Sequence, residues 1–177
     1  MYDGQRGHIS LRRFTLDDTQ KLFQMSKEES LRRFLPDQVY QNYDEASNVV
    51  AFLIRSSEQI HIERAPYVLG VLLNGDELIG HVGASTIEAG IEIGYAIETK
   101  HQGCGYAQQA VSQMLRLLEV NTNIPEVYGI VDPTNEASKK VLERCGFLKI
   151  ATRLDKFDFI HRKQLRCVGE RICEAFN

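Results

Sequence analysis

The segment from residue 91 to residue 119 restricts the fold more than any other part of the chain, because a strand pattern, a glycine turn and an amphipathic helix pattern follow one another. The turn reads Gln102-Gly103-Cys104-Gly105-Tyr106-Ala107. Apolar residues after it recur at spacings of three and four, which predicts a helix over 105–119. Such a junction presents unpaired backbone N–H groups beside the positive end of the helix dipole. We expect it to bind a phosphate or pyrophosphate; an ordinary strand–helix turn is the alternative.

Two familiar nucleotide motifs do not fit this turn. The P-loop requires a Lys after its second glycine, and no Lys stands there. The dinucleotide fingerprint requires a third glycine, and Gln108 occupies that position. The turn therefore predicts an anion site of another kind.

Composition narrows the class of protein. The chain has 177 residues, 43% hydrophobic and 25% charged, which predicts a single folded domain over 1–177. A net charge of −3 argues against nucleic acid as a partner. No apolar run is long enough to cross a membrane, and the polar N-terminus does not resemble a signal peptide. We therefore expect a cytoplasmic protein, with its four cysteines as free thiols and no metal site.

The order of elements predicts an α/β (α+β) fold with a mixed, mostly antiparallel central sheet and helices on both faces. Asn74-Gly75 between two apolar runs indicates a hairpin. Asp44 is the expected N-terminal cap of a helix that reaches about residue 60. Beyond the segment already described, we expect strands over 9–14, 67–73, 78–86, 127–131, 147–154 and 157–165, short helices between 17 and 35, and a helix over 135–145.

Two further segments carry candidate site residues. In the strand 91–97, Glu92 shares one face with Gly94 and Ala96, so this face forms a trough with one carboxylate that could contact a cationic substrate. A surface charge is the alternative interpretation of Glu92. Asn135 and Ser138 stand one turn apart at a helix start, where they either cap the helix or also face a ligand.

Together these segments resemble the GNAT superfamily of acyl-CoA-dependent N-acetyltransferases. The family signature matches Gln102, Gly105 and Ala107, and the segments from Glu92 and from Asn135 to Phe147 follow the family pattern. The similarity is closest to the branch that acetylates the N-termini of ribosomal proteins (RimJ/RimL-like), with spermidine acetyltransferases nearby. It spans about residues 67–150, with a looser similarity of element order back to Ile9.

The resemblance implies acetyl-CoA as co-substrate, without a metal. It places the pyrophosphate on the backbone of the loop, the pantetheine arm beside a splayed strand, and the thioester end near the helix that begins at Asn135. The residues it assigns to acetyl-CoA are Tyr95, Ala96, Ile97, Gln102, Gly103, Cys104, Gly105, Tyr106, Ala107, Asn135 and Ser138.

The expected reaction is direct attack of a primary amine on the thioester in a ternary complex. Glu92 is the first candidate for the base, directly or through water, and His81 is a weaker one. A backbone N–H between Tyr95 and Ile97 would stabilise the oxyanion. Ser138 is the candidate proton donor to the leaving thiolate, because Leu142 stands where many family members have a Tyr. An acyl-cysteine route through Cys104 or Cys145 is disfavoured.

Three classes of function remain in competition. The first is the acetyltransferase, whose acceptor is open between a protein N-terminus, a polyamine, an amino acid and an aminosugar. The second is a non-catalytic acyl-CoA-binding sensor or scaffold. The third, a nucleotide-using phosphotransferase, lacks the Lys and an evident cluster of carboxylates. The sequence leaves the oligomeric state open between a monomer and a homodimer.

Overall fold

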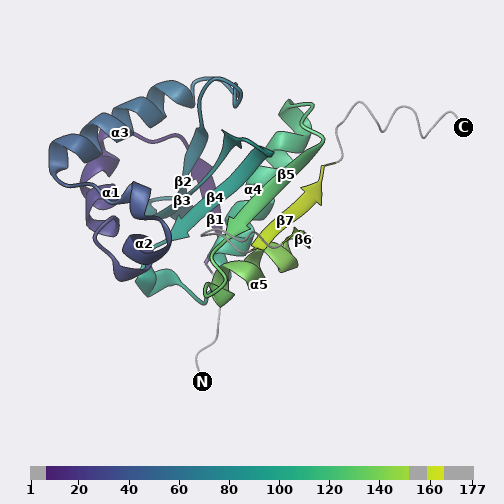
Figure 1. Ribbon diagram of the computed structural model, residues 1–177. Helices are drawn as coiled ribbons and strands as arrows, with labels where there is room; N and C mark the ends of the chain where they lie inside the picture. The colour runs from purple at the N-terminus through teal and green to yellow at the C-terminus, as the bar shows by residue number, and fades with distance from the viewer. Residues whose placement is uncertain (1–6, 152–158, 166–177) are drawn as a thin grey trace, which may run out of the picture.

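A seven-stranded sheet forms the centre of the computed structural model, which describes residues 7–151 and 159–165 (Figure 1). The strand order is β1-β2-β3-β4-β5-β7-β6. β4 and β5 are parallel, and the other neighbouring pairs are antiparallel. The strands are β1 Ile9–Arg12, β2 Tyr67–Leu73, β3 Glu77–Ile87, β4 Gly90–Ile97, β5 Glu126–Val131, β6 Leu148–Ala151 and β7 Phe159–Gln164. The predicted mixed, mostly antiparallel sheet is confirmed.

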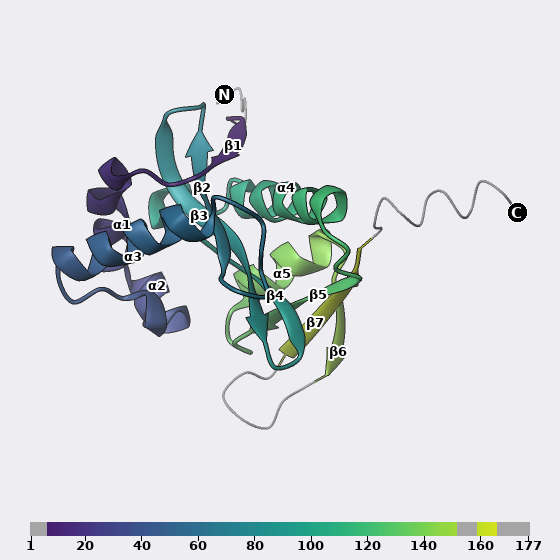
Figure 2. The ribbon, with the colours of Figure 1, turned by 90° about the horizontal axis from the view of Figure 1, so that it is seen from above.

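Helices cover both faces of this sheet, as predicted. Figure 2 shows α1, α2 and α3 on one side and α4 and α5 on the other. They comprise α1 Thr19–Met25, α2 Glu29–Phe34, α3 Tyr43–Ser56, α4 Tyr106–Asn121 and α5 Glu136–Arg144, and short 3-10 turns lie at Leu16–Asp18, Pro36–Gln38 and Thr99–His101. None of the helices described has the length and apolar character needed to span a bilayer.

The hairpin between β2 and β3 forms at the predicted turn. Asn74 and Gly75 have φ values of 53° and 92°, in the left-handed region that Asn and Gly tolerate best. The turn sets the register in which β2 and β3 pair. The Asn-Gly signal is therefore confirmed.

Several predicted boundaries were wrong by a few residues. β1 ends at Arg12 rather than at residue 14, because the Arg12 guanidinium turns to Asp18, 2.7 Å away, where a 3-10 turn follows. The cap of α3 is Asn42 rather than Asp44, since the Asn42 side chain accepts a hydrogen bond from the backbone N–H of Glu45 at 2.9 Å. α3 ends at Ser56, short of residue 60. Part of the expected strand over 147–154 and the start of the strand over 157–165 lie outside the described residues.

The helix α4 anchors the loop that precedes it. Its apolar stripe is buried against β1, β3 and β4. Four residues of the stripe are fully buried: Ala110, Val111, Met114 and Leu118. Burying a large apolar side chain stabilises a fold by roughly 1.5–3 kcal/mol, so the N-terminus of α4 is held firmly at the end of β4.

Candidate active site

β4 and β5 separate shortly after they meet. Among the described residues, their pairing is confined to Glu92 opposite Tyr128. Parallel neighbours normally share an evenly spaced ladder of hydrogen bonds, so the divergence leaves an edge of β4 beside open space. A cavity of about 530 Å³ lies here, lined by β4, β5, the loop 101–108, α2 and α5. An extended ligand can add to such a strand edge as a further strand would.

Gly94 leaves open space beside β4, because it has no side chain. A Cβ atom built on Gly94 would meet no heavy atom within 4 Å, and its φ lies outside the left-handed region. Gly94 and Ala96 both line the cavity, as the predicted trough requires. The space beside Gly94 is therefore room for a ligand.

The glycine loop has the geometry of an anion site. Gly103 and Gly105 have φ values of 76° and 83°, and Gly105 caps α4 without a side chain that would occupy the helix N-terminus. The Gln102 side chain donates a hydrogen bond to the carbonyl of Ile97 at 2.9 Å, which fixes the loop to the end of β4. The loop thus offers backbone N–H groups at a helix N-terminus.

Cys104 and Tyr106 of the loop differ in their relation to the cavity. Cys104 is exposed, is not part of the cavity lining, and its Sγ lies 3.6 Å from the carbonyl of Gln102. Tyr106 is only 8% exposed and belongs to the hydrophobic core, although it also borders the cavity. The loop therefore borders the cavity through Gln102, Gly103, Gly105, Tyr106 and Ala107, whereas Cys104 does not border it.

Glu92 is the carboxylate at the point where β4 and β5 meet, and it lines the cavity. Burial raises the pKa of its carboxyl group, and a hydrogen bond from the backbone of Ile130 offsets part of this shift. A carboxylate of raised pKa is a better proton acceptor than an exposed one. His81 is not part of the lining, and burial lowers its pKa to about 4. The geometry favours Glu92 over His81 as the base.

The start of α5 brings a hydroxyl group to the cavity. Asn135 caps the helix, because its side chain accepts a hydrogen bond from the backbone N–H of Ser138 at 3.0 Å. The Ser138 hydroxyl lies 2.8 Å from the phenol oxygen of Tyr95, on β4, and both residues line the cavity. The Tyr95 hydroxyl also lies 3.1 Å from the Ser138 carbonyl. Ser138 and Tyr95 therefore form one polar pair across the gap.

The helix α2 covers one side of the cavity. Three apolar residues of α2 and of the position after it line the cavity: Leu31, Phe34 and Leu35. Arg33 donates a hydrogen bond to the Thr134 hydroxyl at 3.1 Å, and the Glu28 carboxylate accepts one from the backbone of Thr99 at 2.9 Å. These contacts tie the helix to the loop after β5 and to the end of β4.

The charged residues of the lining are unevenly distributed. Glu92 and Asp132 belong to the strands and their ends, whereas Lys140 and Arg144 are exposed and one turn apart on α5. The Cys145 thiol, next to Arg144, lies 3.6 Å from the carbonyl of Gln108, so this end of α5 lies beside the first turn of α4. The basic pair is therefore close to the glycine loop, where it favours an anion.

Comparison with known proteins identifies the family. Residues 8–148 match the family model described as "Acetyltransferase (GNAT) domain". The chain belongs to the GNAT acetyltransferase family. It is 24% identical to the uncharacterized N-acetyltransferase p20 of Bacillus licheniformis over 144 residues, which cover 80% of this chain and 79% of that protein.

Solved structures of the family share the fold. Mycobacterium smegmatis RimJ, in complex with CoA-disulfide, superposes with a TM-score of 0.76 at 16% identity, over 96% of this chain and 90% of that chain. RimL, a ribosomal L7/L12 alpha-N-protein acetyltransferase in complex with coenzyme A, gives 0.74 at 17% identity, over 89% and 94%. At such identities the likeness concerns the fold alone.

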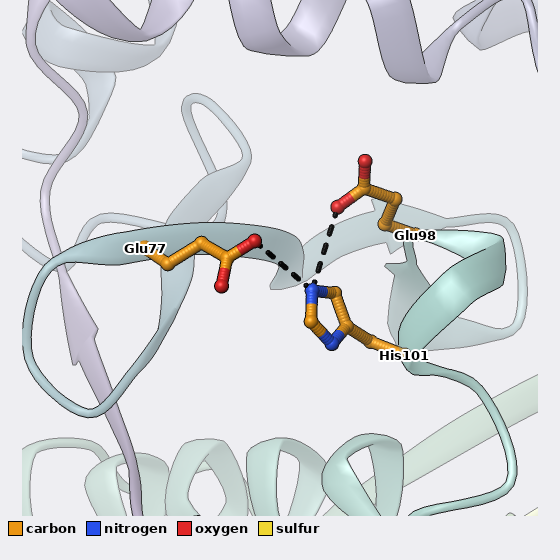
Figure 3. Close-up of side chains that lie close together, drawn as sticks. All are labelled: Glu77, Glu98 and His101. Carbon is orange, nitrogen blue, oxygen red and sulfur yellow. Dashed lines mark hydrogen bonds and ion pairs between the residues drawn. The ribbon is translucent and has the colours of Figure 1, made fainter.

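A network of ion pairs supports the loop of this GNAT domain from behind. Figure 3 shows His101 between two carboxylates, with its Nε2 at 3.1 Å from Glu77 and 3.7 Å from Glu98. The three ligand atoms lie within 4.8 Å of one another, which is a spacing that could hold a metal ion. However, Lys21 is 2.6 Å from Glu98 and Lys100 is 2.9 Å from Glu77. Because cations already engage both carboxylates, we interpret the cluster as a structural link between the hairpin and the loop.

Proposed function

We propose that this GNAT protein is an acetyl-CoA-dependent N-acetyltransferase that transfers the acetyl group to a primary amine by direct attack in a ternary complex. The divergence of β4 and β5 next to the glycine loop is the observation that carries the proposal. The residues fit acetyl-CoA, because the loop supplies backbone donors for a pyrophosphate and the open space beside Gly94 admits a slender chain. The complexes of RimJ and RimL with forms of coenzyme A support the same ligand.

The residues that would hold acetyl-CoA fall into three groups. The backbone of Gln102, Gly103, Cys104, Gly105, Tyr106 and Ala107 binds the pyrophosphate. The backbone edge of β4 at Tyr95, Ala96 and Ile97 lies along the pantetheine arm, and Asn135 and Ser138 border the thioester. Lys140 and Arg144 add positive charge on the same side of the cavity.

Acetyl-CoA supplies an activated acetyl group, and the residues of the chain handle the protons and charges of its transfer. A lysine-like amine has a pKa near ~10.4 and an α-amine one near ~8, so most of the amine is protonated at neutral pH. Glu92, directly or through water, accepts the proton that the amine must lose. A backbone N–H of β4 stabilises the oxyanion, and Ser138 offers its O–H to the departing sulfur.

The acceptor site lies under α2 in this proposal. Leu31, Phe34 and Leu35 form an apolar wall, while Glu92 and Asp132 contribute negative charge to the same cavity. This combination suits a cationic amine attached to an apolar group, as in a protein N-terminus or a small hydrophobic amine. The alternative function is a sensor that binds acyl-CoA without turnover.

An assay of thiol release separates the two functions. Incubation of the protein with acetyl-CoA and a panel of peptide N-termini, polyamines, amino acids and aminosugars should release free coenzyme A with at least one acceptor. Mass spectrometry should then find that acceptor heavier by one acetyl group. Saturable binding of coenzyme A with no thiol release across the panel would favour the sensor. Absence of any binding would contradict both.

A further inference from the structure

Tyr95 reaches from β4 to the start of α5, where it contacts Ser138 twice. Its hydroxyl lies 2.8 Å from the Ser138 Oγ and 3.1 Å from the Ser138 carbonyl oxygen. Burial raises the pKa of the Tyr95 phenol well above its usual range, although the hydrogen bond with Ser138 offsets part of this effect. The phenol therefore remains protonated and acts only as a hydrogen-bond donor and acceptor.

The hydrogen bond between the two hydroxyl groups can have either of them as its donor. The Tyr95 hydroxyl has one hydrogen, and a carbonyl oxygen can only accept. If Tyr95 donates to the Ser138 carbonyl, the Ser138 hydroxyl can donate to the phenol oxygen, and its hydrogen then points away from a ligand. If Tyr95 donates to the Ser138 Oγ, the Ser138 hydrogen is free to reach a third acceptor in the cavity. A negative charge in the cavity selects the second arrangement, because it attracts that hydrogen.

The neighbouring position on α5 cannot supply a hydroxyl. Leu142, one turn after Ser138, is 1% exposed and packs onto Gly129 of β5 so closely that a Cβ there would lie 2.5 Å from its Cδ1. The family resemblance puts a proton-donating Tyr at Leu142 in many members. In this chain the phenol that contacts the site comes from β4 instead.

We infer that Tyr95 is a positioning residue that turns the Ser138 hydroxyl towards the departing sulfur, so that one O–H bond stabilises the thiolate. The inference rests on the proposed acetyl transfer. As the C–S bond breaks, its electron pair passes to sulfur, and Ser138 donates a hydrogen bond to that anion while keeping its proton. The proton lost by the amine goes to Glu92 and later to solvent. The Tyr95 hydroxyl itself does not touch the reacting atoms.

The acidity of bound coenzyme A tests the inference without turnover. The ultraviolet absorbance of the thiolate is titrated with pH in the complex, against the complex with desulfo-coenzyme A as reference. A cysteine-like free thiol has a pKa of about 8.5. We expect the wild-type complex to hold the thiol pKa below that of free coenzyme A. Because a hydrogen bond to a charged group is worth about a factor of ten or more, Tyr95→Phe and Ser138→Ala should each raise the bound pKa by about one unit.

Steady-state kinetics gives a second readout. Tyr95→Phe should lower kcat about tenfold and leave the KM for acetyl-CoA nearly unchanged, whereas the double variant Tyr95→Phe/Ser138→Ala should be no slower than Ser138→Ala alone. Tyr43→Phe, which removes a 46% exposed phenol on α3, is the matched control and should behave as wild type. Equal losses from Tyr95→Phe in both backgrounds, or an unchanged thiol pKa in a protein that binds coenzyme A, would overturn the inference. Failure of the wild type to bind coenzyme A would instead overturn the proposed function.

Discussion

At the scale of single residues, the proposed reaction depends on Glu92 as its base. It stands where β4 and β5 meet, it lines the cavity, and burial raises the pKa of its carboxyl group. As the proposed base, Glu92 loses its function as the pH falls through the raised pKa of its carboxyl group. The acidic limb of activity should therefore lie above the ordinary Glu value of about 4.3.

Substitution of Glu92 should remove the acidic limb of the pH–activity profile. We expect Glu92→Gln to lower kcat/KM for the acceptor by roughly 10²–10⁴-fold, since this is the usual contribution of a general base. The pH profile of the variant should keep only the limb that belongs to deprotonation of the amine. The measurement is kcat/KM for one amine from acidic to alkaline pH, with the dissociation constant of coenzyme A as the control that should not change. An unaltered profile would assign the proton transfer to water alone.

At the scale of elements, local sequence patterns predicted most of the strands and helices. The Asn74-Gly75 turn and the apolar stripe of α4 are each determined by a few neighbouring residues. Both predictions were confirmed. The strand–glycine loop–helix junction was predicted for the same reason. Boundaries were less certain, because the cap at Asn42 and the contact of Arg12 with Asp18 compete with neighbouring residues of similar propensity.

Contacts between distant segments were beyond sequence reasoning. The pair of Tyr95 and Ser138 joins residues 43 positions apart, and nothing local in either segment indicates the other. The position of α2 is a second example. The sequence predicted a short helix here without a location, and Arg33 and Glu28 hold it against the cavity through contacts 101 and 71 positions away in sequence.

The role assigned to α2 can be tested at Phe34. Phe34 lines the cavity, and the guanidinium carbon of Arg33 lies 4.9 Å from the centre of its ring. If this wall binds the apolar part of the acceptor, Phe34→Ala should lower kcat/KM for apolar amines by roughly 10–100-fold, from the lost burial. Affinity for coenzyme A should stay within twofold. Phe52→Ala, on α3 and 42% exposed, is the control. Equal activity of Phe34→Ala and wild type towards all acceptors would place the acceptor elsewhere.

At the scale of the whole molecule, the fold places one cavity across the plane of the sheet. Successive side chains of a strand point to opposite faces. Glu92 and Gly94 therefore face the side opposite to Tyr95, which reaches α5. The cavity thus lies between α2 on one face and α5 on the other, and the proposed path of coenzyme A follows the edge of β4 beside Gly94, between these helices. The account depends on the space between β4 and β5 being a site for coenzyme A.

Calorimetric titration of coenzyme A into wild type and Gly94→Leu tests that claim most directly. Gly94 has open space beside it and no left-handed φ, so a Leu should be tolerated by the backbone while its side chain fills the gap. We predict saturable one-site binding to wild type, and loss of at least a hundredfold in affinity in a Gly94→Leu protein with nearly unchanged melting temperature. No heat of binding to wild type at millimolar coenzyme A, or equal binding by both proteins, would contradict the account.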